Sequence, residues 1–334
     1  MSINKTAIVC GLALTMYHVP CTMYQTWAED AAQPAASTAP PAPPAEVTLT
    51  VDEAVRHVSS ADSLEREQGL YELGMLKSRD HLTQVTDALG DPHVHVQRAA
   101  VVALRLILVA EAVPQLESLA RTARRPEVRE QALHELQALQ AAKALPTMTQ
   151  AWRKDRQWRV RLAAVEALGA TNDASAVAPL TQALRSRMPE LRRSAAIALG
   201  DLKQLATPSV PELIRHVRGD ADENVRVDAA EALRNIGDAR AVPALLKTLN
   251  DPEDRVRIPA FKALEAWAQP GMEAQVAPYL NHGRPHERVY AAKILAKIGS
   301  PTALALLKAR CARETHERVK PVLVDAIRAV EHHS

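Results

Sequence analysis

Histidine and glutamate residues stand close together at several places in this 334-residue chain, in patterns that could bind a metal ion. Imidazole and carboxylate groups are common ligands of zinc and iron. The candidates are His93 with His95, His134 with Glu135, and the two HERV sequences that begin at His286 and His316. Consecutive residues on a helix point about 100° apart, so His134 and Glu135 cannot easily face one ion. We therefore predict no metal site and no cofactor.

An aromatic and basic cluster occupies the sequence AWRKDRQWRVR, which contains Trp152 and Trp158. Arginine and tryptophan together can recognise a ligand by stacking, so both tryptophans are candidate partner-binding residues. The alternative is that they fill an irregular gap between helices. No nucleophile elbow, phosphate loop or carboxylate pair stands out along the chain. The sequence therefore predicts no catalytic residue and a protein that is not an enzyme.

A basic residue recurs seven positions before an aliphatic residue throughout most of the chain. The arginines in this column are Arg66, Arg129, Arg161, Arg192, Arg226, Arg257 and Arg288. A carboxylate often lies six residues before a member of the column, as Asp155 does before Arg161. This spacing favours a structural arginine ladder, in which each guanidinium bonds to turns and loop carboxylates of its own or the next repeat. A stripe that binds anions is the alternative.

The aliphatic residues themselves recur every 31 to 34 positions. They are Leu73, Leu104, Leu136, Leu168, Leu199, Leu233, Leu264, Leu295 and Ile327. A period of this length indicates stacked supersecondary units, and the absence of alternating strand patterns indicates two helices in each unit. Hydrophobic residues make up 47% of the chain but aromatic residues only 3%, which suits close packing of helices. We therefore expect an all-α fold.

Proline and glycine mark the helix boundaries within the units. Proline stands near the start of the first helix in five units, where its missing N–H has no partner to lose. The residues are Pro114, Pro146, Pro179, Pro211 and Pro243. Glycine is expected to end many second helices in a left-handed conformation. These residues are Gly74, Gly169, Gly200, Gly237 and Gly299.

The pattern VRxxAAxALGxIGD followed by AVPxLLxxLxDP resembles HEAT repeats, specifically the short HEAT-like repeats of phycobilisome lyases. The resemblance implies a right-handed α-solenoid of about nine two-helix repeats over residues 52–334, with the second helices on its concave face. One enzyme family with such repeats, the deoxyhypusine hydroxylases, binds two irons through His-Glu pairs directly after the repeat arginine. Leu162, Arg193 and Val227 occupy those positions here, so that resemblance predicts no iron site.

The N-terminal region differs from the repeats. Residues 1–28 combine Lys5 with an apolar run from Ala7 to Tyr17 that is too short to span a bilayer, which predicts an export signal or signal anchor. Residues 29–51 form a linker rich in proline and alanine. We expect an exported protein, periplasmic or extracellular, that contacts a membrane only through an uncleaved N-terminus.

The expected function is a non-enzymatic scaffold that binds a protein or peptide on the concave face. Lys plus Arg (41) nearly equals Asp plus Glu (39), so the net charge does not favour nucleic acid. Five positions after each basic residue lies a variable column that should point away from the core: Tyr71, Val102, His134, Glu166, Ile197, Glu231, Lys262, Lys293 and Asp325. We predict partner contacts at its members His134, Glu166, Glu231, Lys262 and Lys293, and no small-molecule substrate. The alternative is an enzyme or enzyme accessory of the bilin-lyase or di-metal type.

Overall fold

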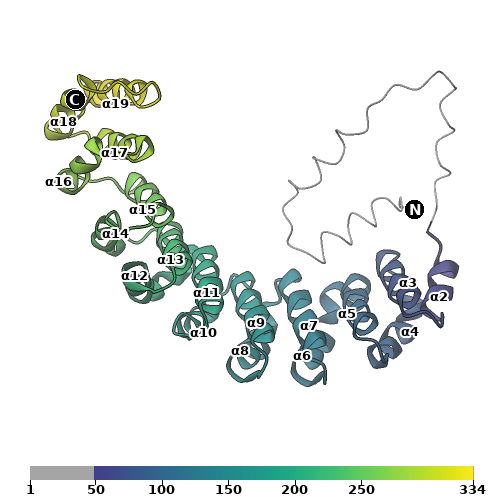
Figure 1. The fold of residues 1–334 in the computed structure, drawn as a ribbon. Coiled ribbons are helices and arrows are strands. Elements are labelled where there is room, and N and C mark those ends of the chain that lie inside the picture. Colours follow the sequence, from purple (N-terminus) through teal and green to yellow (C-terminus); the bar gives the residue numbers. More distant parts are fainter. Residues whose placement is uncertain (1–48, 334) are drawn as a thin grey trace, which may run out of the picture. The chain divides into compact units, whose positions relative to one another are not determined.

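The computed structural model describes residues 49–333, and these residues form helices and turns without a strand (Figure 1). The predicted leader, residues 1–28, and all but the last residues of the predicted linker lie outside this range. The helices divide into two compact units, the first up to Val109 and the second from Ala110 onward. The first unit contains two helical pairs, α2 (Val51–Val58) with α3 (Ser63–Met75) and α4 (Leu82–Asp87) with α5 (Val94–Leu108).

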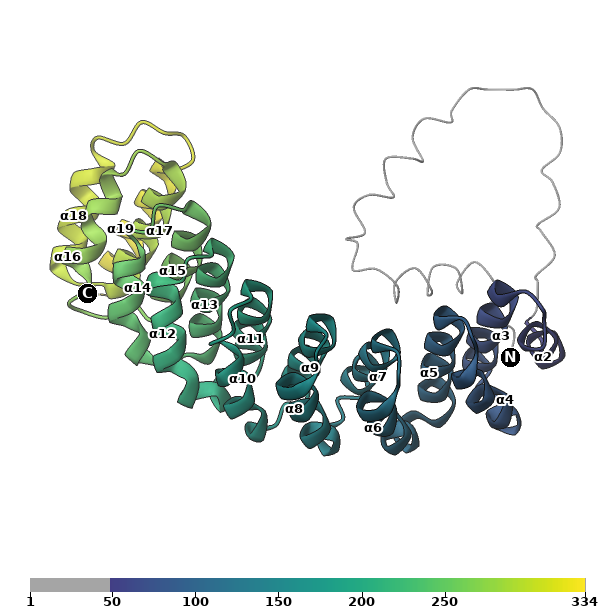
Figure 2. The ribbon, with the colours of Figure 1, turned by 60° about the horizontal axis from the view of Figure 1, so that its bottom comes forward.

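The second unit contains seven further pairs. Its first helices are α6 (Val113–Thr122), α8 (Leu145–Lys154), α10 (Val177–Ala183), α12 (Val210–Gly219), α14 (Val242–Thr248), α16 (Glu273–Val276) and α18 (Pro301–Cys311). Its second helices are α7 (Pro126–Ala138), α9 (Trp158–Ala170), α11 (Pro189–Asp201), α13 (Glu223–Ile236), α15 (Asp254–Ala266), α17 (Pro285–Ile298) and α19 (Lys320–His333). Within this unit the first helices lie on one side and the second helices on the other (Figure 2).

Short 3-10 segments connect many of these helices. They are η3 (Arg79–His81), η4 (Ala88–Gly90), η5 (Val109–Ala112), η6 (Ala142–Ala144), η7 (Ala174–Ala176), η8 (Lys203–Ser209), η9 (Ala239–Ala241) and η10 (Ala277–Asn281). With two pairs in the first unit and seven in the second, the expected all-helical solenoid of nine two-helix repeats is confirmed over the described residues.

The core lies between the two helix layers and is built from the aliphatic column. Its leucines are almost completely buried from Leu73 to Leu295, whereas Ile327 in the last repeat is half-buried. Pairs of buried alanines such as Ala163 and Ala164 accompany these leucines on the second helices. Because alanine adds little bulk, neighbouring second helices can approach closely while their leucines fill the space between layers.

The expected role of the glycines is correct at only two of the five positions. Gly237 and Gly299 have φ values of 79° and 66° and end α13 and α17. Gly74, Gly169 and Gly200 lie inside helices instead, where the next repeat leaves little room for a side chain. A Cβ atom on Gly169 would lie 2.6 Å from the Cβ atom of Ala198. In the repeats without a terminal glycine the positive φ falls on Lys77, Val109, Gln140, Asn172 and Lys203.

One stretch, Val94–Thr122, is long and apolar enough to cross a membrane by length and composition. Half of the most apolar 18-residue segment in this stretch is nevertheless buried. The chain also turns at Val109, where φ is 52°. Helix packing therefore accounts for the apolar composition of α5 and α6.

Candidate functional site

The arginine ladder joins successive repeats within each unit. In Arg129 the Nη1 group donates to the carbonyl of Ala123, six residues earlier, while Nε donates to Asp155 of the next repeat at 2.7 Å. The same two-way bonding occurs at Arg66 with Asp91, Arg192 with Asp220, Arg226 with Asp251, Arg257 with Glu287 and Arg288 with Glu314. Arg161 reaches the Met188 sulfur at 3.6 Å instead, because Ser186 stands where other repeats carry an acid.

The ladder carboxylates are held in their charged form by these bonds. Burial alone would raise the pKa of the Asp220 carboxyl, but bonds from Arg192, the Asp222 amide and His216 lower it to about 2. Burial likewise opposes ionisation of Glu314, whereas the His316 amide and Arg288 lower its pKa to about 2. The ladder guanidinium groups therefore have their main partners inside the protein, which leaves them poorly placed to bind an external anion.

The predicted partner-binding column lies on the second-helix side. In the second unit His134, Glu166 and Glu231 are half-exposed, while Lys262 and Lys293 are exposed. Burial lowers the pKa of His134, but Glu130 and Glu166 outweigh it and raise the pKa above its usual value. The column therefore carries acidic charge on α9 and α13 and basic charge on α15 and α17. In the first unit Tyr71 and Val102 are buried, contrary to the expectation, because these apolar side chains pack into the helix layers.

A groove of about 370 Å³ follows part of this column between α9 and α11. It is lined by Leu162, Glu166 and Asp201, with Ile197 48% exposed beside them. Arg193 at its edge donates to Asp228 of α13 at 2.8 Å. The structure thus brings Glu166 next to an exposed apolar side chain, a combination suited to a protein surface that is both apolar and basic.

The two predicted tryptophans differ in their surroundings. Trp158 begins α9 with 38% of its surface exposed, and the guanidinium carbon of Arg159 lies 5.6 Å from its ring centroid. Trp152 is half-buried in α8, and its buried Nε1 atom has no hydrogen-bond partner among the described residues. Only Trp158 therefore offers an aromatic and cationic surface to a partner.

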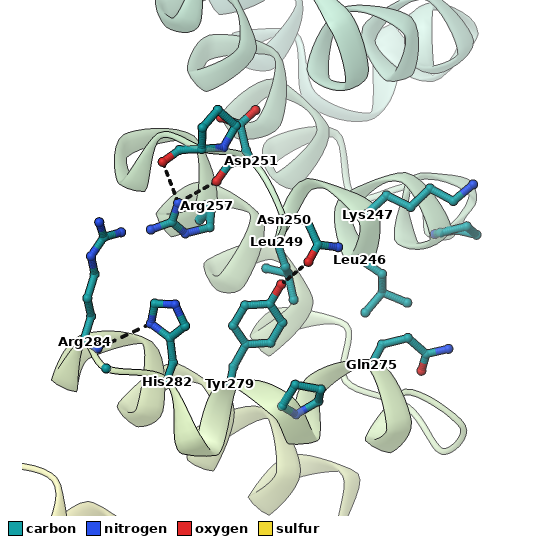
Figure 3. Close-up of a pocket in the computed structure, with 14 residues that line it drawn as sticks. Leu246, Lys247, Leu249, Asn250, Asp251, Arg257, Gln275, Tyr279, His282 and Arg284 are labelled. Atoms are coloured by element: carbon teal, nitrogen blue, oxygen red, sulfur yellow. Dashed lines mark hydrogen bonds between the residues drawn. The ribbon is translucent and has the colours of Figure 1, made fainter.

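A larger pocket, of about 1040 Å³, opens between α14 and the segment from α16 to η10 (Figure 3). We call it the α14–η10 pocket. Its lining includes Leu246, Lys247 and Asn250 from the α14 side and Tyr279 and His282 from the η10 side. The Tyr279 hydroxyl donates to Asn250 Oδ1 at 3.0 Å, across the gap between the two repeats. The sequence-based hypotheses did not include these residues.

A buried ion-pair network closes one end of the pocket. The Glu287 side chain is fully buried and accepts from Arg257 Nη2 at 2.7 Å, while His282 Nδ1 lies 2.9 Å from its other oxygen. Arg284 and Arg257 both contact Asp254. Opposite charges in this network balance each other, so the network fixes the loop that carries His282 and Arg284.

Aromatic rings gather behind the pocket although they are scarce in the chain. Phe261, the single phenylalanine, meets Tyr279 edge-on at a centroid distance of 5.2 Å and stacks on Tyr290 at 5.6 Å. Burial, followed by the charge of Glu287, raises the pKa of Tyr279 above its usual 10. Its hydroxyl is therefore neutral at physiological pH and donates its one proton to Asn250.

The sequence contains a signal for this pocket that pattern matching overlooks. Tyr279 stands nine residues before Arg288, at a position that is small in most repeats, among them Ala88, Ala120, Ala183, Val217 and Thr248, and large in two, where it is His57 or Trp152. His282 replaces the usual acid six residues before the arginine. The first helix of this repeat is also short, since α16 has four residues and is followed by five residues of η10. Three departures from the repeat pattern thus fall in one repeat.

The histidine candidates do not assemble into a metal centre. Among residues 49–333, no group of three or more His, Cys, Asp or Glu side chains is placed to bind a metal ion. The rings of His93 and His95 lie 5.5 Å apart, and His93 faces the ladder carboxylate Asp91. His316 donates its backbone N–H to Glu314. These histidines therefore take part in, or lie beside, the arginine ladder.

The comparisons with known proteins agree with this architecture. A family model of HEAT repeats matches residues 52–137, 113–200, 177–265 and 243–328. Two curated relatives are the bilin biosynthesis proteins PecE of Mastigocladus laminosus, 34% identical over 118 residues, and of a Nostoc species, 36% identical over 105 residues. The matches span 33% and 29% of this chain and 42% and 40% of the relatives, so the chain matches about two fifths of their length.

A solved structure of an engineered protein resembles the fold, with a TM-score of 0.54, 18% identity, and coverage of 84% of this chain and 88% of that one. The likeness extends to the fold alone. The two relatives correct one expectation: the prediction that the chain is not an enzyme is wrong, because both are bilin biosynthesis proteins. They also conflict with the expectation that the chain has no small-molecule substrate.

Proposed function

We propose that this chain, which belongs to the HEAT-repeat family, is a bilin-lyase-type solenoid that binds a linear tetrapyrrole and holds a partner protein. In this role it acts as the enzyme or as a subunit of the enzyme that attaches or isomerises the chromophore. The match with the two bilin biosynthesis proteins is the observation that carries the proposal, since it extends over more than a hundred residues at about one third identity.

The two sides of the second unit suit two different occupants. The second-helix side presents the charged column and the groove beside Ile197. Such a surface, with acids on α9 and α13 and lysines on α15 and α17, fits an extended protein that carries both charges. The first-helix side presents the larger α14–η10 pocket, which has the volume of a small-molecule site. Protein and chromophore could then be held by one chain at the same time.

The proposal is tested by titrating the purified chain with biliverdin, a linear tetrapyrrole, while recording its visible absorption spectrum. A bilin held in a protein pocket is less exposed to water than a free one, so we expect a saturable change in its long-wavelength absorption band. Gel filtration should show the absorbing species eluting with the protein. Free biliverdin that elutes separately, with an unchanged spectrum at tens of micromolar protein, would contradict the proposal.

For the N-terminal region we propose export of the mature chain. The support is the sequence of residues 1–28, with an apolar run and the small residues of TWA before Glu29. The Pro/Ala-rich segment would then act as a spacer between the solenoid and the envelope.

A further inference from the structure

The α14–η10 pocket combines a void, an aromatic wall and two separated cations in a single repeat of the second unit. We propose that this pocket is the binding site of the linear tetrapyrrole, with the conjugated rings against Tyr279 and the propionate groups toward Lys247 and Arg284. The inference rests on the proposed function and adds the location and the contacts of the bilin.

The void lies beside a first helix that is wound largely as a 3-10 helix. α16 has four residues and continues directly into the five residues of η10, whereas α14 has seven α-helical residues and α18 has eleven. Leu246 and Pro243 of α14 line the open space on the other side. At about 1040 Å³ the pocket lies at the upper end of the range for small-molecule sites, so an extended tetrapyrrole fits within it.

The aromatic wall is held rigid from behind. Phe261 contacts Tyr279 edge-on and stacks on Tyr290, and the Tyr279 hydroxyl is tied to Asn250. Figure 3 shows the Tyr279 ring at the centre of the residues that line the pocket, between Asn250 and His282. A ring fixed at both ends loses little conformational entropy when a planar ligand stacks on it.

The cations lie on opposite sides of this ring, with Lys247 on one side and Arg284 on the other (Figure 3). Among the described residues, no carboxylate lies within ion-pair distance of the Lys247 ammonium. Arg284 is about half exposed, and a single nitrogen, Nη1, contacts Asp254 and lies 3.6 Å from Glu287, so its other N–H groups remain for a ligand. Two carboxylates on flexible propionate arms can reach cations placed in this way.

The groove between α9 and α11 is less suited to the same ligand. It is about one third of the volume of the α14–η10 pocket, and its lining includes the acids Glu166, Glu190 and Asp201. These carboxylates would repel the propionates of a bilin. The observations therefore favour the first-helix side for the chromophore.

Binding of biliverdin to the full chain and to two variants tests this assignment. Tyr279→Leu removes the stacking surface and should weaken binding about fivefold, because an aromatic contact of this kind is worth about 1 kcal/mol. Lys247→Gln removes one cation and should weaken binding several-fold. The matched control is Lys143→Gln, which removes an exposed lysine from η6 and should bind like the wild type. Biliverdin dimethyl ester, which lacks free carboxylates, should bind the wild type more weakly than the acid does. It should bind the wild type and Lys247→Gln with the same affinity, because it has no carboxylate for Lys247 to contact.

The outcomes separate this inference from the proposed function. If the wild type does not bind biliverdin, both are overturned. If it binds, and Lys247→Gln and the ester leave the affinity unchanged, the function stands and the pocket assignment is overturned. Far-UV circular dichroism checks the fold of each variant. Should Tyr279→Leu lose its helical signal, the decision rests on Lys247→Gln and the ester, which leave the aromatic cluster intact.

Discussion

Replacing Asp220 with asparagine should destabilise the middle of the second unit in a pH-dependent way. Asp220 is almost completely buried and accepts bonds from Arg192 Nη2 at 2.6 Å, from the Asp222 amide, and from His216 Nδ1 at 2.7 Å. Asparagine keeps the size of the side chain but removes its charge. Arg192 would retain its bonds to the carbonyls of Ser186 and Arg187 while losing its buried counter-ion.

The size of the effect follows from the pKa of Asp220, which is lowered from 3.8 to about 2 in the folded protein. A difference of that size corresponds to about 2 kcal/mol of folding free energy for this carboxylate. Since the folded pKa lies below the unfolded one, the contribution is complete above the unfolded value near 3.8. It is lost as the pH falls from there toward 2.

Urea unfolding followed by far-UV circular dichroism measures this contribution. At pH 7 the variant Asp220→Asn should be about 2 kcal/mol less stable than the wild type, and the gap should narrow at pH 3. Asp201→Asn, an exposed acid at the end of α11, is the control and should change stability by less than about 0.5 kcal/mol. A gap below about 0.5 kcal/mol at pH 7, or an equal gap at both pH values, would refute the reasoning.

Three further predictions concern packing, partner binding and location. Gly169→Ala should lower the stability by about 1–3 kcal/mol in the same urea assay, because its methyl group would collide with Ala198; an unchanged midpoint would contradict the close approach of α9 and α11. A quadruple charge reversal should leave the melting temperature nearly unchanged, yet retain less of the host protein that co-purifies with the wild type, with a smaller difference at high salt. It changes Glu166→Lys, Glu231→Lys, Lys262→Glu and Lys293→Glu. Cell fractionation with N-terminal sequencing should find the mature chain outside the cytoplasm, beginning near Glu29, whereas cytosolic protein that begins at Met1 would refute export.

The fold could be predicted from the sequence because the same aliphatic and basic positions recur in nearly every repeat. Successive leucines of the column from Leu73 to Leu295 are one repeat apart. If each leucine is buried beside the leucine of the next repeat, the second helices of all repeats must have the same orientation. The spacing of Asp155 and Arg161 likewise indicated ion pairs near the turns. Local periodicity determines these features, so no knowledge of distant contacts was needed.

The roles of individual glycines could not be predicted in the same way. Gly169 lies eight residues after its ladder arginine, Arg161, and is inside a helix against Ala198, whereas Gly237 lies eleven residues after Arg226 and ends a helix with a φ of 79°. Treating both as helix ends ignored this offset of three residues. The close approach of Ala198, which explains why position 169 has no side chain, is a tertiary contact that a single repeat pattern does not contain.

The α14–η10 pocket was missed because it results from a departure from the pattern. His282 stands at a position where other repeats carry small or acidic residues, and Tyr279 at one that is small in most of them, so neither residue belongs to a recurring column. Their proximity to Asn250 and Lys247 arises only when α14 and η10 are placed side by side. The prediction that the chain is not an enzyme was wrong for the related reason that no catalytic motif interrupts the repeats.

The most direct test of the account is a crystal structure of the full chain with biliverdin. Difference density for an extended tetrapyrrole should cover the ring of Tyr279 in the α14–η10 pocket, with propionate density directed toward Lys247 and Arg284. Density for the bilin on the second-helix side, or an α14–η10 pocket without bilin density in crystals that have taken up the pigment, would contradict it.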